Sequence, residues 1–179
     1  MRKKYLSDYI LEERTDADSG KIRRVPVYRG RYYAFCLQGG QLLKTKKLFT
    51  SLTVLCILAF LSALVVNAPC GHRWYVMFPL AVMVFPLFFQ AESCLLLYTS
   101  GNKLTREQRD KTEQRMIFTS AILGVFSLFS LTGHIVSMVI YKETWRDVVY
   151  LAAAVVIFAS SAVMIAKRAT LKTEELSQK

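Results

Sequence analysis

Long stretches without a charged residue set the pattern of this sequence. They run from Leu48 to Val66, from Trp74 to Asn102 with a single acid at Glu92, from Met116 to Tyr141, and from Val148 to Ala166. A helix rises about 1.5 Å per residue, so about 20 apolar residues cross a hydrocarbon core about 30 Å thick. Lipid offers no water to backbone amides and carbonyls, which favours helices. The pattern therefore predicts an all-α integral membrane protein with four transmembrane helices.

Charged and helix-breaking residues between these stretches indicate where each helix ends. We expect spans at about 46–67, 74–99, 106–141 and 147–167, within a transmembrane domain of residues 46–168. The third helix should run unbroken from below the membrane, because Thr105 and Gln108 have capping-box spacing and no breaker follows them. Short connections make successive helices antiparallel, so the sequence predicts an up-down-up-down bundle.

The positive charges are distributed unevenly between the predicted loops. Residues 1–47 hold 12 Lys or Arg, residues 100–115 hold five and residues 167–179 hold four, whereas the other two loops hold three in all. The positive-inside rule then predicts a multi-pass plasma membrane protein whose N- and C-termini are both cytoplasmic. This distribution accounts for the net charge of +11 without nucleic acid as a partner. The small size and lysine-rich start are typical of bacterial proteins.

The cytoplasmic N-terminal segment, residues 1–45, is expected to hold a short helix near Tyr5–Glu13 and then a β-hairpin. Two β-prone runs flank Arg29 and Gly30, which predicts the hairpin over residues 21–35. At the other end of the chain, residues 169–179 are expected to form a cytoplasmic tail that is frayed or a short helix.

Basic and aromatic side chains alternate in the predicted hairpin. This composition suits the headgroups of an anionic inner leaflet, at about 1 kcal/mol per basic residue near the surface. It equally suits a partner protein, or a solvated flank with no binding role. The candidate membrane-surface or partner-binding residues are Arg23, Arg24, Arg29, Arg31, Tyr32 and Tyr33.

Glu92 and His134 are the candidate polar residues inside the predicted spans. A charge at the centre of a bilayer costs about 2.5–3.5 kcal/mol on insertion scales, so such residues are candidates for function. Glu92 is either a neutral carboxyl bonded to a Ser, Tyr or Gln of a neighbouring helix, or a proton or cation site. His134 either makes a packing hydrogen bond or belongs to a relay. The predicted spans place the two residues about 10 Å apart along the membrane normal, which is too far for a direct bond but close enough for a water-bridged relay.

Small residues recur along the third and fourth predicted helices. Such residues let helices approach closely in lipid, where no hydrophobic force drives their association. We expect both stripes to pack within the bundle, against another membrane protein, or against a second copy of the chain. The residues are Ser120, Gly124 and Ser127 in the third helix, and Ala152, Ala159 and Ala166 in the fourth.

Motifs for catalysis are missing from the sequence. It contains no His cluster with metal-ligand spacing, no Gly-rich phosphate loop and no nucleophile elbow, and its four cysteines are dispersed. We therefore expect no enzymatic activity, no cofactor and no metal. The sequence favours a non-enzymatic accessory or interaction protein that docks a partner through its cytoplasmic segment and small-residue helix faces. The alternative is a small oligomeric transporter or channel that uses Glu92 as an ion- or proton-coupled group.

Overall fold

The computed structural model describes residues 3–15, 22–37, 39–66, 69–141 and 145–176. This part of the chain is mostly helical, and four of its helices are long and apolar enough to span a membrane. They are α1 (Gly39–Val66), α2 (Trp74–Thr99), a continuous helix over Arg106–Ile140, and α5 (Trp145–Ala166). The continuous helix consists of α3 (Arg106–Arg109), a π-helical segment η3 (Asp110–Arg115) and α4 (Met116–Ile140).

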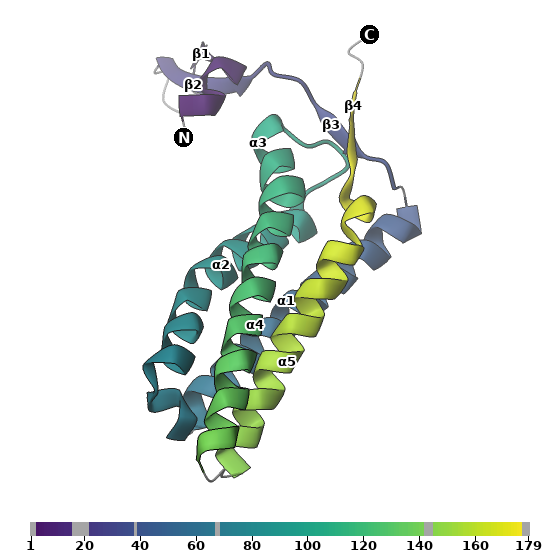
Figure 1. The fold of residues 1–179 in the computed structure, drawn as a ribbon. Helices are drawn as coiled ribbons and strands as arrows, with labels where there is room; N and C mark the ends of the chain where they lie inside the picture. The colour runs from purple at the N-terminus through teal and green to yellow at the C-terminus, as the bar shows by residue number, and fades with distance from the viewer. Residues whose placement is uncertain (1–2, 16–21, 38, 67–68, 142–144, 177–179) are drawn as a thin grey trace.

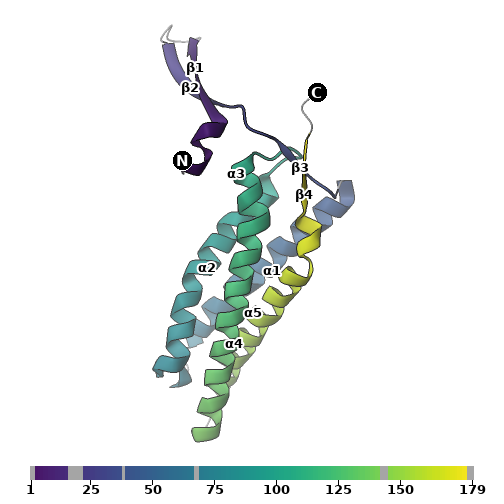
Figure 2. The same cartoon turned by 45° about the horizontal axis from the view of Figure 1, so that its top comes forward.

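The four long helices lie side by side (Figures 1 and 2). α1 packs against α2 and α5, and α4 packs against the other sides of α2 and α5. The β-strands, α3 and both ends of the described chain lie at one end of these helices (Figure 1). We call this the charged end, and we call the end with the turn η2 (Pro69–His72) the opposite end.

The outer faces of the four helices are apolar, and their interior contains both apolar and hydroxyl side chains. Large apolar side chains such as Leu58, Phe85 and Val139 are exposed on the outer faces. The buried polar side chains of the long helices include Thr53, Gln90, Ser93, Thr119, Ser120, Ser127, Ser130, His134, Ser137, Ser160 and Ser161. Several of the hydroxyls bond to carbonyls of their own helix, which satisfies them without a partner from another helix. An apolar exterior of this extent fits a lipid environment and is unusual on a monomer in water.

Gln90 is one of these buried polar side chains. Its Nε2 is 3.0 Å from Met164 Sδ and 3.5 Å from Thr53 Oγ1, and its Oε1 is 3.5 Å from Ser120 Oγ. The Gln90 side chain is fully buried, so these contacts satisfy its amide where water has no access. One side chain of α2 therefore contacts α1, α4 and α5.

A small N-terminal β-hairpin is present, but the predicted position over residues 21–35 is wrong. β1 (Tyr9–Thr15) pairs antiparallel with β2 (Ile22–Tyr28), so the predicted helix near Tyr5–Glu13 is also wrong beyond the short 3-10 turn η1 (Lys3–Asp8). Cross-strand ion pairs, including Arg24 with Glu13, favour this register over the predicted one.

The chain turns a corner at Gly30, where a hairpin turn had been predicted. The Tyr28 side chain folds back over Gly30, and its hydroxyl donates to the Arg31 carbonyl at 2.8 Å. A Cβ atom at Gly30 would lie 2.6 Å from that hydroxyl oxygen, so only glycine leaves room for the ring. The corner directs the next strand, β3 (Tyr33–Phe35), away from β2.

The C-terminal tail, predicted to be frayed or a short helix, forms a short 3-10 turn and then a strand. After α5, the 3-10 turn η4 (Arg168–Leu171) leads into β4 (Thr173–Glu175), which pairs antiparallel with β3. Leu171 is fully buried at this joint, which holds the tail against the N-terminal segment. The predicted capping box is confirmed, because the Thr105 hydroxyl accepts from the Gln108 amide and the Gln108 side chain accepts from the Thr105 amide.

Candidate functional site

The N-terminal segment is fastened to the start of the long third helix at the charged end. Lys4 Nζ and the Tyr5 hydroxyl both donate to Asp110 Oδ2, at 2.8 and 2.9 Å. The hydrogen bond to Asp110 and its negative charge raise the pKa of Lys4 above its ordinary value. The Tyr28 hydroxyl also accepts from the Arg106 amide at 3.0 Å, at the positive N-terminus of the helix. The base of the hairpin is therefore held on α3 and η3.

A second joint connects β3 and β4 to the same helix. Tyr33 and Leu104 exchange two backbone hydrogen bonds, at 2.9 and 2.8 Å. The Arg109 guanidinium lies 4.5 Å from the centre of the Tyr33 ring and donates to Thr173 Oγ1 at 3.1 Å. Tyr33 is buried here. Its side chain therefore contributes to this joint and is not available to a partner.

The remaining basic-aromatic candidates lie on the surface. Arg24, Arg29 and Arg31 have side chains that are 64–74% exposed, and they pair with Glu13, Glu12 and Glu175 at 3.0–3.1 Å. Exposed pairs of this kind contribute about 0–1 kcal/mol each, so a partner's carboxylates can replace them at little cost. Tyr32 is half-buried and packs its ring edge-on to Tyr28. The backbone of Arg23 belongs to β2, and its side chain lies outside the described residues.

Glu92 belongs to an ion-pair cluster near the charged end. Its carboxylate lies 2.6 Å from Arg115 Nη2 and 3.4 Å from Lys111 Nζ, and its side chain is 43% exposed. Lys111 also pairs with Glu107 at 3.0 Å, one helical turn away. The interpretation of Glu92 as a carboxyl bonded to a Ser, Tyr or Gln of a neighbouring helix is therefore wrong. Its carboxylate instead contacts two cations of the long third helix.

His134 lies at the opposite end, far from Glu92. It is fully buried, and its ring stacks on the Tyr150 ring at 5.8 Å. Arg115, which contacts Glu92, precedes His134 by 19 residues in one continuous helix, a separation of about 28 Å. The predicted distance of about 10 Å is wrong, and the water-bridged relay between the two groups loses its geometric basis.

A buried polar cluster surrounds His134 at the opposite end. The Cys70 amide donates to Asp147 Oδ1 at 3.1 Å, and the Tyr150 hydroxyl lies 3.4 Å from both Ser130 Oγ and the Val76 carbonyl. These contacts tie the turn η2 and α2 to α4 and α5. Within the described ranges, no group of three or more His, Cys, Asp or Glu side chains could hold a metal ion.

The two predicted small-residue stripes have different positions. Ser120 and Ser127 are buried and Gly124 is half-buried, with Gly124 closest to Ser161 of α5. Ala152, Ala159 and Ala166 are exposed on the outer face of α5. The first stripe therefore lies between helices of this chain. The second faces outward, where lipid or another chain could cover it.

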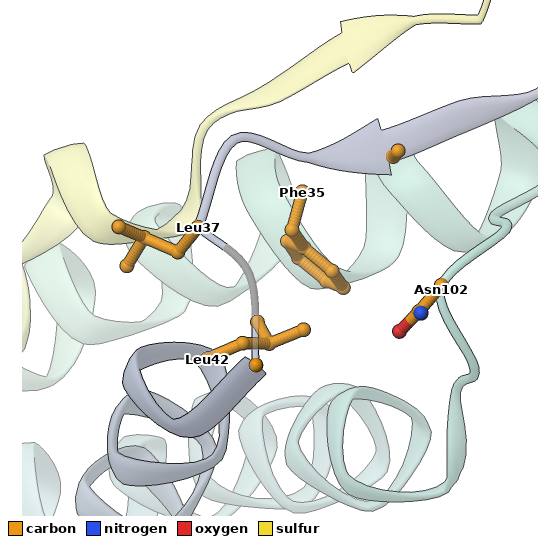
Figure 3. Close-up of a pocket in the computed structure, with 6 residues that line it drawn as sticks. Phe35, Leu37, Leu42 and Asn102 are labelled. Carbon is orange, nitrogen blue, oxygen red and sulfur yellow. The ribbon is translucent and has the colours of Figure 1, made fainter.

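A small hollow of about 270 Å³ lies at the charged end, between the start of α1 and β3. Figure 3 shows Phe35, Leu37, Leu42 and Asn102 around it. Among the described residues, none of the side chains that line it is charged.

The partners of Glu92 could have been found from the sequence. Glu92 lies seven residues before the end of α2, and Arg115 lies nine residues after the start of α3. Two antiparallel helices joined by a short loop bring such positions to a similar level. The spacing of Lys111 and Arg115, four apart, places both cations on one helix face. The polar interior around Gln90 gave no comparable signal in the sequence.

No protein-family model, curated protein or solved structure matches this chain. The four long apolar helices fit the class of multi-pass membrane proteins.

Proposed function

We propose that this chain is a non-enzymatic interaction protein of a bacterial plasma membrane, which its four helices cross in up-down-up-down order. The charged end lies in the cytoplasm, where the β1–β2 hairpin docks a partner protein. Insertion is supported by the apolar outer faces, and orientation by the concentration of Lys and Arg at the charged end.

The exposed hairpin is the observation that carries this proposal. Leu11 and Ile22 are 64% and 68% exposed, and Ile10 and Val25 are also exposed. Figures 1 and 2 show β1 and β2 projecting beyond α3, away from the four long helices. A hairpin that leaves this much apolar surface uncovered is marginal in water by itself. Exposed apolar groups beside exposed arginines are typical of a surface that a partner covers.

The outer edge of β1 is the better docking edge. In the part of the chain that the structure describes, β1 and β2 pair only with each other. Pro26 deprives β2 of an amide donor, whereas β1 contains no proline. Residues 1–37 hold nine Lys or Arg against five Asp or Glu. We therefore propose an extended, acidic partner segment that adds to β1 through backbone hydrogen bonds.

Purification from the native host in mild detergent tests the docking role, with the mass of the intact complex as the readout. We expect one unlike protein in fixed stoichiometry, and we expect Leu11→Asp to reduce its amount at least tenfold. The new carboxylate would place a charge at the apolar contact and repel an acidic segment. Leu11 is exposed, so this change should leave folding intact.

The matched control is Leu176→Asp, which changes an exposed leucine beyond β4 and away from β1. The control should retain the partner. Equal loss in both variants, or retention in both, would contradict docking at β1. A preparation that contains only copies of this chain would argue instead for a homo-oligomer.

The transporter alternative has less support from the geometry. Glu92 is held by Arg115 and Lys111 near the charged end, and the buried His134 is far from it. No contact of Glu92 in the described chain suggests a passage through the four helices. If the Glu92→Gln variant carried the same ion or proton flux as the wild type in reconstituted vesicles, the remaining argument for this alternative would be removed.

The native cysteines offer a test of orientation. Cys36 is exposed at the charged end, whereas Cys56, Cys70 and Cys94 are buried. Burial and the neighbouring Asp147 raise the pKa of Cys70 to about 12, so its reactive thiolate is scarce at ordinary pH. We expect a membrane-impermeant maleimide to leave the chain unlabelled in intact cells and to label one cysteine per chain after permeabilisation.

Cys36 itself should react slowly. Burial and Glu174 raise its pKa, so less thiolate is present at a given pH and the reaction speeds up as pH rises. Cys36→Ser should abolish the labelling of permeabilised cells. Labelling of intact cells that disappears in Cys36→Ser would place the charged end outside and contradict the proposed orientation.

A further inference from the structure

A groove runs along the outer surface between α2 and α4. Its central part, about 460 Å³, is lined by apolar side chains with Pro86 and Thr119 as its buried floor. Phe85 and Phe118 are exposed at its sides. The Thr119 hydroxyl bonds to the Met116 carbonyl of its own helix, so the floor leaves no donor unsatisfied. The groove therefore offers an apolar channel on the lipid-facing surface.

The groove opens into a charged hollow towards the charged end. This hollow measures about 470 Å³ and shares Arg115 and Phe118 with the apolar part. Its lining adds Lys4, Asp110 and Lys111. The two hollows together form one amphipathic site, with charged groups at one end and aromatic rings along the rest.

The dimensions of this site match one leaflet of a bilayer. The apolar part extends along the third helix from Arg115 to Phe126, a rise of about 16 Å over 11 residues. Half of a hydrocarbon core about 30 Å thick is about 15 Å. A lipid chain in the groove would thus reach from the charged hollow to about the bilayer midplane.

The charges at the mouth of the groove are balanced. Lys4, Lys111, Arg115 and Asp110 line this mouth, and Glu92 and Glu107 lie beside it as ion-pair partners of the lining cations Lys111 and Arg115. Such a mouth gives no net attraction for a purely anionic headgroup. It complements a headgroup that carries both signs, because the cations can bind a phosphate while a carboxylate accepts hydrogen bonds from an ammonium group.

We propose that the α2–α4 groove binds a phospholipid with a primary ammonium headgroup, phosphatidylethanolamine, from the leaflet at the charged end. Lys4, Lys111 and Arg115 face its phosphate, Glu92 accepts from its ammonium, and one acyl chain lies along Phe85 and Phe118. A choline headgroup has no N–H to donate, and a glycerol headgroup has no positive charge. This inference rests on the proposed membrane insertion and is independent of the docking role of the hairpin.

Lipid retention on the purified full-length chain tests the site. The delipidated protein is incubated with an equimolar mixture of phosphatidylethanolamine, phosphatidylcholine and phosphatidylglycerol of identical acyl chains, and the bound lipid is counted by native mass spectrometry. We expect phosphatidylethanolamine to be retained at least fivefold over each of the others. Equal retention of the three lipids, or a preference for phosphatidylglycerol, would overturn the headgroup assignment.

Two tryptophan variants of the same helix locate the bound lipid. Ile122→Trp fills the groove and should reduce retention of phosphatidylethanolamine at least fivefold. Val125→Trp adds the same bulk at an exposed position that does not line the groove and should retain the lipid. Unchanged retention in Ile122→Trp would overturn the site. If that variant fails to fold, Phe85→Ala, which removes an exposed groove wall, replaces it with the same expected loss.

Glu92→Gln separates headgroup selection from chain binding. The neutral amide oxygen accepts a weaker hydrogen bond than the carboxylate, so the preference for phosphatidylethanolamine over phosphatidylcholine should fall at least twofold while the total bound lipid stays within twofold. An unchanged preference would overturn the role of Glu92. The maleimide test of orientation reports insertion separately, so failure of the lipid site can be distinguished from failure of the proposed membrane topology.

Discussion

Gly133→Ala is expected to destabilise this protein, whereas Gly124→Ala in the same helix should be nearly neutral. A Cβ atom at Gly133 would lie 3.0 Å from the Tyr75 carbonyl oxygen and 3.3 Å from the Tyr75 ring. The carbonyl belongs to the backbone of α2, so the two helices must separate to admit a methyl group. Overpacking of this kind typically costs about 1–3 kcal/mol.

Gly124 provides the matched control because its surroundings have space. A Cβ atom there would lie 3.6 Å from Ser161 Cβ, an ordinary van der Waals distance. The replacement of glycine by alanine within a helix also lowers backbone entropy in the unfolded chain. We expect a change of less than about 1 kcal/mol in the free energy of unfolding at Gly124.

Unfolding of both variants in mixed micelles, followed by tryptophan fluorescence or circular dichroism, measures the difference. Gly133→Leu should lower the free energy of unfolding further than Gly133→Ala does. If Gly133→Ala were as stable as the wild type, the close approach of α2 and α4 at Tyr75 would be contradicted. If Gly124→Ala were the more destabilised variant, the assignment of the tight contact to Gly133 would be wrong.

The sequence predicted a packing role for Gly124 but not for Gly133. Gly124 stood out because it shares a stripe with Ser120 and Ser127, and the structure does place that stripe between helices. Gly133 lies on no such stripe, and its contact depends on which turn of α2 lies opposite it. Periodicity identifies the faces of one helix, but the axial offset between two helices depends on both of their connections.

The long helices were predictable because each coincides with a long apolar stretch almost free of charged residues. The observed starts of α2, α3 and α5 lie within two residues of the predicted spans, whereas α1 starts at Gly39 instead of residue 46. The positive φ of Gly39 fits a glycine at the first residue of that helix. The glycine pair Gly39 and Gly40 therefore forms the first two residues of this helix.

The short strands were not predictable to the same degree. β2 has β-prone runs on both sides, so local pattern allows it to pair with residues 9–15 or with residues 33–35. Pairing of β3 with β4 joins residues about 140 apart in sequence, which no local rule can anticipate. For the candidate site, the sequence identified Glu92 and the exposed arginines but not the Lys111 and Arg115 partners of Glu92.

Arg115→Met is expected to destabilise the chain more than Glu92→Gln, although the two residues form one ion pair. Besides Glu92, the Arg115 guanidinium donates to Ser93 Oγ at 3.0 Å and to the Phe89 carbonyl at 3.3 Å. Its side chain is 17% exposed against 43% for Glu92. Exposed pairs contribute about 0–1 kcal/mol and broken buried pairs cost about 3–5 kcal/mol, so a loss of about 2–3 kcal/mol is expected.

Glu92→Gln should cost less than about 1 kcal/mol, because the amide oxygen still accepts from Arg115 and water reaches the side chain. Arg31→Met is the control, since Arg31 is exposed and pairs only at the surface with Glu175. The same unfolding measurement ranks the three variants. If Glu92→Gln were the costliest, the carboxylate and not the guanidinium would hold α2 to the long third helix. The cluster would then act as a buried charge site, and the case for an ion-coupled Glu92 would return.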